Sequence, residues 1–495
     1  MTLGLMMLVC LVGAALVNPV AGTILCAVCL ALQLITVFVR MAAAGFGTVC
    51  TGRHLVDSNP VPGGTPKQVV FSVHIATHNE PAGIVIDTLN ALARQDFPGD
   101  RFEVIVMDNN TEDRRLWMPV EQRCRELGPG FRFMHRSGVK GAKAGALNIA
   151  LDEARKDATY IVTVDADYVV TPRFLSGAAD ALTRTNADYV QYPQAYAGSD
   201  GYAEGVDAEL EEYFLSSAPL ANDTESLLLT GTLCVISKKA LRACGGWSGV
   251  TTTEDAELGV RLCARHFVGR FEAEVVGAGM LPLSLKDLQK QRYRWTSGNL
   301  QTLALHLRAL AGSGSAIELR KRLVIISQLT AWVNFCLLPA CVLLTMLMTG
   351  RGTPLAIHLA ALSILVCAAD ILWRLTRRGA ADGSDWRRIF LAVTSRVALS
   401  PVAAQATFDA LIGAKATFVV TNKDCASYQS GMPIAATLTA VAAAASLPAA
   451  VGEGPMAAMA VVLLLLPLPA ALLTDRALGA YRRRISKPLS ERTAA

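Results

Sequence analysis

The sequence has few charged and few aromatic residues for its length. Of its 495 residues, 18% are Asp, Glu, Lys or Arg and 6% are Phe, Trp or Tyr, whereas soluble chains carry about 25% charged residues. Hydrophobic residues reach 52% of the chain and the mean hydropathy is +0.37. This composition argues against a wholly soluble protein.

A strong basic excess is also missing, and so is an organised set of cysteines. The net charge is only +5 and is spread along the chain, so no nucleic-acid partner is expected. Twelve cysteines are scattered through the sequence, and several, such as Cys26, Cys336 and Cys367, lie inside apolar runs. We interpret them as small buried side chains, and we predict neither a zinc site nor a disulfide framework.

The apolar residues are concentrated toward the two ends of the chain. Residues 3–39 and 322–475 are largely apolar, while residues 50–320 have the composition of a globular domain. About 20 apolar residues are needed to cross a bilayer. We therefore predict six spans: Leu3–Val17, Ala21–Val39, Leu323–Met348, Leu355–Trp373, Pro433–Val451 and Met456–Leu473. A cleaved signal peptide is the alternative for the first span, but the basic start of such a peptide is missing.

Basic residues predict how these spans are oriented. Lys and Arg stay on the cytosolic side of a membrane, so Arg40, Arg53 and Lys67 place the globular domain in the cytosol. The basic tail at Arg482–Arg484 is placed there too. A further span at Ile389–Ala414 would force this tail outside, so we predict that this segment is a helix lying in the cytosolic interface.

The globular region alternates between strand and helix patterns. Predicted strands are Val69–Ala76, Phe102–Met107, Phe131–His135 and Tyr160–Val164, and predicted helices are Ile84–Arg94 and Ala144–Lys156. This alternation predicts a mostly parallel sheet with helices on both faces.

Polar residues follow three of these strands. They are His78-Asn79-Glu80, Asp108-Asn109-Asn110 and Asp165-Ala166-Asp167. Ligands bind beyond the carboxyl ends of such strands, although acids there can also be simple turn formers. A dinucleotide-binding fold would need a glycine fingerprint after the first strand, and residues 76–81 do not contain one.

Two of the acidic clusters fit the needs of nucleotide-sugar transfer. A diphosphate leaving group is neutralised by a divalent ion between carboxylates and phosphate oxygens, a task that suits Asp165 and Asp167. Glu254 and Asp255 begin a predicted helix, Ala256–His266, and could supply a carboxylate base. Acids also collect at helix N-termini for purely electrostatic reasons.

A third cluster could hold an acceptor sugar. The segment 291–295 contains Gln291, Arg294 and Trp295 just before a predicted apolar helix, Leu300–Leu310. The C–H face of a sugar can stack on Trp, while Gln and Arg reach oxygen atoms. The alternative is an interfacial Trp with basic anchors beside a membrane.

Taken in order, these residues resemble the D, DxD, TED and QxxRW series of processive family 2 glycosyltransferases, which include cellulose, chitin and hyaluronan synthases. The residues that carry the resemblance are Asp108, Asp165, Asp167, Thr253, Glu254, Asp255, Gln291, Arg294 and Trp295. The segments 143–148 and 190–194 are similar to the KAGxLN and VQTPQ elements, and 418–423 is similar to the FxVTxK gating loop. Two positions depart from the pattern, namely Asn109 for a second acid and Asp424 for a glycine.

The resemblance implies a Rossmann-like GT-A domain inserted between membrane helices, with a UDP-sugar donor and Mg²⁺ or Mn²⁺. Asp108, Lys143, Asp165, Asp167, Thr421 and Lys423 would bind the nucleotide sugar, with Asp165 and Asp167 also holding the metal. Asp255, with Glu254, would be catalytic, and Gln291, Arg294 and Trp295 would bind the acceptor. We expect burial to raise the pKa of Asp255 toward the working range.

The predicted activity is inverting transfer, with glucose as the expected sugar, to the end of a growing β-glycan that passes through the protein's own helices. The alternative is a glycolipid synthase that adds one or a few sugars to a membrane lipid. A transporter or scaffold with a silent domain is a third possibility. The expected location is the bacterial inner membrane, and export partners are unknown.

The predicted organisation has six parts. They are a membrane hairpin (1–41), a linker (42–66), the cytosolic GT-A domain (67–285), interfacial helices carrying QxxRW (286–321), a membrane region (322–475) and a cytosolic tail (476–495). The membrane region is expected to include the interfacial helix 389–414 and the gating loop 416–425.

Overall fold

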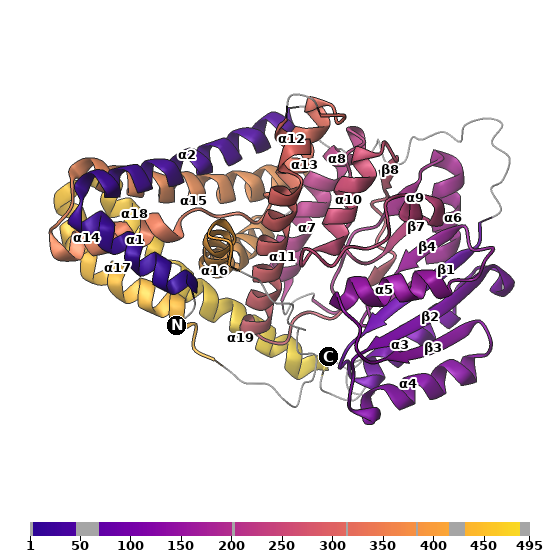
Figure 1. Ribbon diagram of the computed structural model, residues 1–495. Helices are drawn as coiled ribbons and strands as arrows, with labels where there is room; N and C mark the ends of the chain where they lie inside the picture. Colours follow the sequence, from indigo (N-terminus) through magenta and orange to yellow (C-terminus); the bar gives the residue numbers. More distant parts are fainter. Residues whose placement is uncertain are drawn as a thin grey trace.

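A computed structural model describes residues 3–45, 69–199, 203–312, 315–382, 385–414 and 431–485. An α/β domain forms one end of the molecule and a bundle of long helices forms the other (Figure 1). The N-terminal helices pack in the bundle against helices from the C-terminal third of the chain (Figure 1). Residues far apart in sequence therefore build both ends.

The α/β domain is built on a seven-stranded mixed sheet with the order β3-β2-β1-β4-β7-β6-β8. The strands are β1 (Phe71–Thr77), β2 (Phe102–Asn109), β3 (Phe131–Arg136), β4 (Tyr160–Thr163), β6 (Tyr189–Gln191), β7 (Cys234–Ser237) and β8 (Gly269–Phe271). Strands β3, β2, β1 and β4 are mutually parallel, whereas β7 runs antiparallel to β4 and β6. The predicted α/β fold with a largely parallel sheet is confirmed.

Helices cover both faces of the sheet because the central strands are apolar on both sides. They are α3 (Ala82–Ala93), α4 (Arg114–Leu127), α5 (Ala142–Glu153) and α6 (Phe174–Thr185). Helices α3, α4 and α6 share one buried apolar cluster with the sheet, and α5 contributes to another. A small ladder of β5 (Val169–Val170) and β9 (Gly277–Ala278) lies beside this sheet.

Further helices, from 5 to 21 residues long, lie between β6 and the helix bundle along the chain. They are α7 (Glu204–Glu212), α8 (Ala218–Asp223), α9 (Lys238–Ala243), α10 (Glu254–Ala264), α11 (Leu285–Leu305), α12 (Leu307–Ala311) and α13 (Leu319–Leu329). A π-helical turn, Tyr213–Ser217, joins α7 to α8.

Helix α11 begins at Leu285, well before the predicted helix start at Leu300. The Ser284 hydroxyl caps it by accepting a hydrogen bond from the backbone N–H of Asp287 at 3.1 Å. The apolar helix was predicted to start too late because the first turns of α11 are polar and carry no apolar periodicity, although helices carrying QxxRW were predicted over 286–321. Residues 291–295 therefore lie inside a helix.

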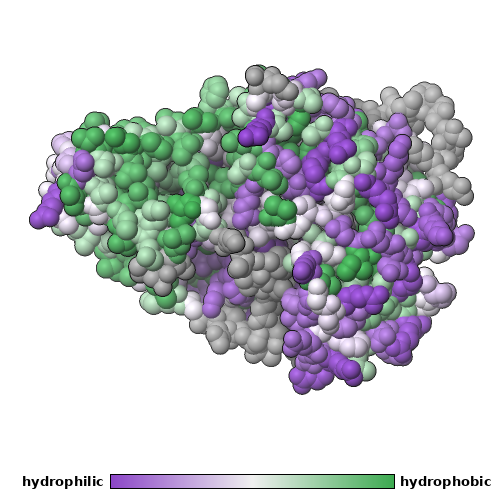
Figure 2. Space-filling model, viewed as in Figure 1, coloured by the Kyte–Doolittle hydropathy of each residue, from purple (hydrophilic) through white to green (hydrophobic). Residues whose placement is uncertain are grey.

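The bundle contains α1 (Leu3–Val17), α2 (Pro19–Ala44), α14 (Leu337–Thr349), α15 (Pro354–Asp382), α16 (Trp386–Leu411), α17 (Ile434–Glu453), α18 (Pro455–Leu465) and α19 (Pro467–Ile485). Five helices among the described residues are long and apolar enough to cross a membrane. Large apolar side chains cover the outside of the bundle, while the α/β domain is mainly hydrophilic (Figure 2). Such an exposed apolar surface indicates a membrane protein.

The predicted single helix Leu323–Met348 is in fact two helices. Helix α13 ends at Leu329 and α14 begins at Leu337, so residues 330–336 form a break. The break leaves the carbonyl of Ala331 without a helical partner, and the Arg374 guanidinium donates to it at 2.7 Å. Helix α16, predicted to lie in the interface, is among the five long apolar helices. Its position and the six-span count remain predictions.

Candidate active site

A cavity opens at the edge of the sheet where β1, β2 and β4 end. We call it the donor cavity, and it has about 390 Å³ of space for the centres of water molecules; one water needs about 10–15 Å³. The three strands are adjacent and parallel, so the residues that follow them meet at one edge. Predicted site residues that line the cavity are Lys143, Asp165, Asp167, Glu254, Asp255, Gln291, Arg294 and Trp295.

Asp108 lies at the same sheet edge but beneath the wall of the cavity. Its side chain is buried and accepts hydrogen bonds from the hydroxyls of Thr77 (3.0 Å) and Thr111 (2.7 Å). His135 Nδ1 lies 2.8 Å from the other carboxylate oxygen. The neighbouring Asn109 lines the cavity instead. Asp108 thus holds the ends of three strands together, and its predicted contact with a nucleotide remains untested.

Lys143, near the start of α5, forms an ion pair with Asp165, which follows the end of β4. Its Nζ lies 2.5 Å from Asp165 Oδ1, 3.0 Å from the carbonyl oxygen of Gly231 and 4.0 Å from Glu254. Burial lowers the pKa of Lys143, but the carboxylates of Asp165 and Glu254 outweigh burial and raise the pKa above its ordinary value. Lys143 is therefore a fixed positive charge facing the donor cavity.

Asp165 and Asp167 follow β4 and both face the donor cavity. The backbone N–H of Asp165 donates to Thr232 Oγ1 at 3.0 Å, and Asp167 Oδ2 accepts from the Met280 N–H at 3.3 Å. No cluster of three or more His, Cys, Asp or Glu side chains able to hold a metal occurs within the described ranges. Mg²⁺ typically binds one or two carboxylates together with substrate phosphates and waters, so this pair fits such an ion.

Asp255 projects from the first turn of α10 toward the donor cavity. Burial, followed by the neighbouring Glu254 carboxylate, raises the pKa of Asp255 to about 7. Gly231, with φ of +87°, passes so close that a Cβ atom there would lie 2.7 Å from Asp255 Oδ2. The predicted direction of the pKa shift is confirmed, and a glycine is needed where this loop meets the carboxylate.

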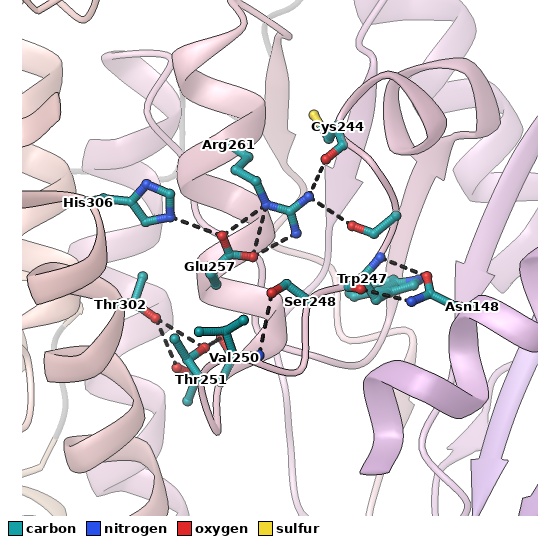
Figure 3. A network of polar contacts seen from close by, with 12 residues as sticks. Asn148, Cys244, Trp247, Ser248, Val250, Thr251, Glu257, Arg261, Thr302 and His306 are labelled. Atoms are coloured by element: carbon teal, nitrogen blue, oxygen red, sulfur yellow. Dashed lines mark hydrogen bonds and ion pairs between the residues drawn. The ribbon is translucent and has the colours of Figure 1, made fainter. Parts of the chain in front are cut away.

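A network of polar contacts holds α10 in place (Figure 3). Glu257, buried on α10, pairs with Arg261 at 2.6 Å and with His306, the residue after α11, at 2.9 Å. Arg261 also donates to backbone carbonyls of the turn before α10. Asn148 of α5 exchanges two 2.8 Å hydrogen bonds with the backbone of Trp247 in that turn. The helices that carry Lys143, Asp255 and the QxxRW residues are thereby braced against one another.

Gln291, Arg294 and Trp295 project from α11 toward the donor cavity. The hydroxyl of Tyr196 donates to Gln291 Oε1 at 3.4 Å, which links α11 to the loop after β6. Trp295 also lines a second, smaller cavity. The predicted acceptor residues therefore lie where two cavities adjoin.

The second cavity, which we call the inner pocket, lies behind Asp255 and Trp295. It has about 60 Å³ of space for water centres, far less than the donor cavity. The two share Gln194, Thr230, Thr253, Asp255 and Trp295 as lining residues. The remaining wall of the inner pocket includes Tyr213, Phe214, Gln328 and Trp332.

Buried ion pairs join the α/β domain to the bundle next to the inner pocket. Glu209 of α7 pairs with Arg292 at 2.5 Å and also with Arg396. Glu212 pairs with Arg374 at 2.7 Å and with Arg396 at 3.5 Å. We call these five residues the membrane-side cluster.

Sequence reasoning missed the inner pocket and the membrane-side cluster. Tyr213, Glu209 and Trp332 belong to none of the recognised motifs, and Trp332 lay within a predicted span. Glu209 and Glu212 lie in an acid-rich segment, Glu204–Glu212, so no pattern in the sequence singled them out. Thr421 and Lys423, predicted to close over the nucleotide, lie outside the described residues.

The sequence matches two protein families over this region. Residues 72–245 match glycosyl transferase family 2, and residues 160–372 match glycosyl transferase family group 2. The fold resembles the mannosyltransferase PcManGT from Pyrobaculum calidifontis, solved in complex with GDP-Man and Mn²⁺. The TM-score is 0.52 at 17% identity, over 79% of this chain and 100% of that one. The predicted GT-A fold is thereby confirmed.

Curated relatives include a UDP-forming cellulose synthase catalytic subunit from Xanthomonas axonopodis pv. citri. It is 28% identical over 271 residues, which are 53% of this chain and 36% of the relative. A beta-monoglucosyldiacylglycerol synthase from Synechocystis sp. is 27% identical over 46% of this chain and 47% of the relative. The chain thus spans about a third of the first relative and about half of the second. It carries a family 2 glycosyltransferase domain and is homologous to cellulose synthase catalytic subunits.

Proposed function

We propose that the protein transfers a sugar, with inversion, from a UDP-sugar to an acceptor hydroxyl held beside Trp295 at a membrane. One observation carries this proposal. A single cavity is lined by a fixed cation, a pair of aspartates, a carboxylate whose pKa is near neutrality, and a tryptophan. These are the groups that the transfer requires.

The donor diphosphate is assigned to Lys143, Asp165 and Asp167. Lys143 supplies a positive charge for phosphate oxygens. Mg²⁺ or Mn²⁺, held by Asp165 and Asp167 when bound, would offset the negative charge that develops on the departing diphosphate. The Mn²⁺ and GDP-Man in the Pyrobaculum enzyme support this assignment, and the UDP-forming relative favours uridine as the nucleoside of the donor.

Asp255 is assigned as the general base, with Glu254 beside it. Its carboxylate takes the proton of the acceptor hydroxyl, whose oxygen bonds to the anomeric carbon as the bond from that carbon to the UDP oxygen breaks. A pKa of about 7 suits this role because both protonation states are accessible at physiological pH. A single displacement inverts the anomeric configuration and gives a β-linked product from an α-linked donor.

Gln291, Arg294 and Trp295 are assigned to the acceptor. From sequence we predicted that glucose is added to a growing β-glycan that leaves through the membrane helices. The small inner pocket favours the alternative, an enzyme that adds one or a few sugars to a lipid, because a long chain would need more space. The homology to the Synechocystis glycolipid synthase supports this second candidate.

The arginine pattern supports a cytosolic catalytic domain, residues 67–285, in a bacterial inner membrane. We propose that the gating loop, 416–425, closes over bound UDP through Thr421 and Lys423. Lipids of that membrane are then the nearest partners of the helix bundle.

Nucleotide release tests the proposal. Purified protein would be given UDP-glucose, UDP-N-acetylglucosamine or GDP-mannose with Mg²⁺ or Mn²⁺, and free nucleotide and product size would be measured. We expect UDP release with one UDP-sugar, abolished by chelating the divalent ion. Absence of nucleotide release with every donor would contradict the proposal.

A further inference from the structure

Trp332 separates the inner pocket from a third cavity inside the helix bundle. It is buried in the break between α13 and α14, with 7% of its surface exposed. The third cavity has about 30 Å³ of space for water centres and is lined by charged residues that include Arg40, Asp370 and Arg374. Among the described residues, Trp332 alone lines both the inner pocket and this cavity. It is therefore the wall between them.

The Trp332 side chain is held firmly. The guanidinium carbon of Arg292 lies 3.7 Å from its ring centroid, and that of Arg396 lies 4.6 Å from it. Both arginines pair with the buried Glu209, so neither can leave the ring without breaking a buried ion pair. The carbonyl of the preceding residue, Ala331, accepts from Arg374 at 2.7 Å. The side chain and the backbone of this wall are thus both anchored to the membrane-side cluster.

The acceptor residue Trp295 faces this wall directly. The two indole rings lie 5.9 Å apart between centroids. A saccharide lying on Trp295 and extending inward therefore meets Trp332 within the inner pocket. Beyond Trp332, the third cavity contains the Arg40–Asp370 ion pair and little free space.

We propose that Trp332 determines acceptor length. It ends the acceptor pocket, so the enzyme accepts and produces only short saccharides, free or attached to a lipid. The inference rests on the proposed function and narrows its acceptor class. Trp332 acts as a steric wall and takes no part in proton transfer.

The experiment measures product length for each UDP released. Purified wild type, Trp332→Ala, Trp332→Phe and the control Trp373→Ala would receive the UDP-sugar that supports nucleotide release. Trp373, on α15, also lies near an arginine, with Arg377 5.3 Å from its ring, but it lines none of the three cavities. Products would be sized by mass spectrometry.

We expect short products from the wild type and from Trp373→Ala. Trp332→Ala removes most of the indole, a side chain that buries on the order of 150–250 Å², so its mean product length should exceed that of the wild type. The mean product length of Trp332→Phe should lie between those of the wild type and Trp332→Ala. The wild type should also lose activity as added β-linked oligosaccharide acceptors become longer.

Two results would overturn the inference while leaving the proposed function intact. One is UDP release by the wild type with long polymer as the product. The other is an active, folded Trp332→Ala protein whose products are as short as those of the wild type. If Trp332→Ala fails to fold, the inference is tested by the product length of Trp332→Phe and by the activity of the wild type on acceptors of increasing length. Absence of nucleotide release with every donor would overturn both proposals.

Discussion

The donor cavity and the membrane-side cluster use the same kinds of charged groups in different surroundings. Lys143 and Asp165 pair beside a large cavity, and the Asp165 side chain is 37% exposed. Glu209 and Arg292 pair with side-chain exposures of 1% and 3%. An ion pair open to a cavity can exchange its partner for a ligand, whereas a sealed pair stabilises a junction. Exposure therefore separates the Lys143–Asp165 pair, which faces the donor cavity, from the sealed Glu209–Arg292 pair, which joins the two regions.

The largest expected effect on turnover comes from a substitution in the donor cavity. Asp255→Asn removes the proposed base and should lower turnover by about 10²–10⁴-fold, the usual contribution of general base catalysis. Asp152→Asn, at an exposed surface position, is the matched control and should have no effect. Turnover is measured as UDP release. Similar rates for the two variants would contradict the assignment of Asp255.

In the membrane-side cluster, Glu209→Gln should lower the free energy of unfolding. It leaves Arg292 buried without a carboxylate and Arg396 with only Glu212, at 3.5 Å, and breaking a buried pair costs about 3–5 kcal/mol of unfolding free energy. Denaturation in detergent would measure this loss. Glu204→Gln, on the same helix but paired with the exposed Arg387, should cost less than about 1 kcal/mol. Equal losses would show that burial does not distinguish the two pairs.

The pH dependence of kcat provides a second test of the role assigned to Asp255 in the donor cavity. Asp255 acts as a base only when deprotonated, and its pKa is raised to about 7. When chemistry limits the rate, kcat should therefore be constant above pH 8 and should fall about tenfold per pH unit well below pH 7. The residual activity of Asp255→Asn should lack this fall. A wild-type kcat that stays flat from pH 5 to 9 would exclude Asp255 as the titrating base.

The smallest expected effect comes from the loop that approaches Asp255. A Cβ atom at Gly231 would lie 2.7 Å from Asp255 Oδ2, so Gly231→Ala should displace the carboxylate and reduce turnover by about tenfold. Gly245→Ala is the control, because Gly245 also has positive φ, +83°, but has no atom within 4 Å of the added Cβ. Both should be destabilised similarly by backbone strain. Equal turnover in the two would refute the contact.

Much of the α/β domain could be predicted because its strands are short apolar runs followed by polar residues. Strand β1 was predicted at Val69–Ala76 and lies at Phe71–Thr77. The gathering of Asp165, Asp255 and Trp295 at one cavity followed from the sheet topology and the motif series. The burial of Asp108 could not be predicted in this way, because its partner His135 comes from another strand.

The junction with the bundle could not be predicted because tertiary contacts determine it. The run Leu323–Met348 is apolar enough to be one helix, yet it breaks at residues 330–336. The contact that supports the break comes from Arg374, more than forty residues later in the chain. No local pattern reports such a partner.

Helix α11 carries two neighbouring residues that face different regions. Gln291 faces the donor cavity, while Arg292 is bound to Glu209 and lies over Trp332. A rigid helix cannot turn one of these side chains without turning the other. A change in how the bundle packs around Arg292 would therefore also be felt at Gln291 in the donor cavity.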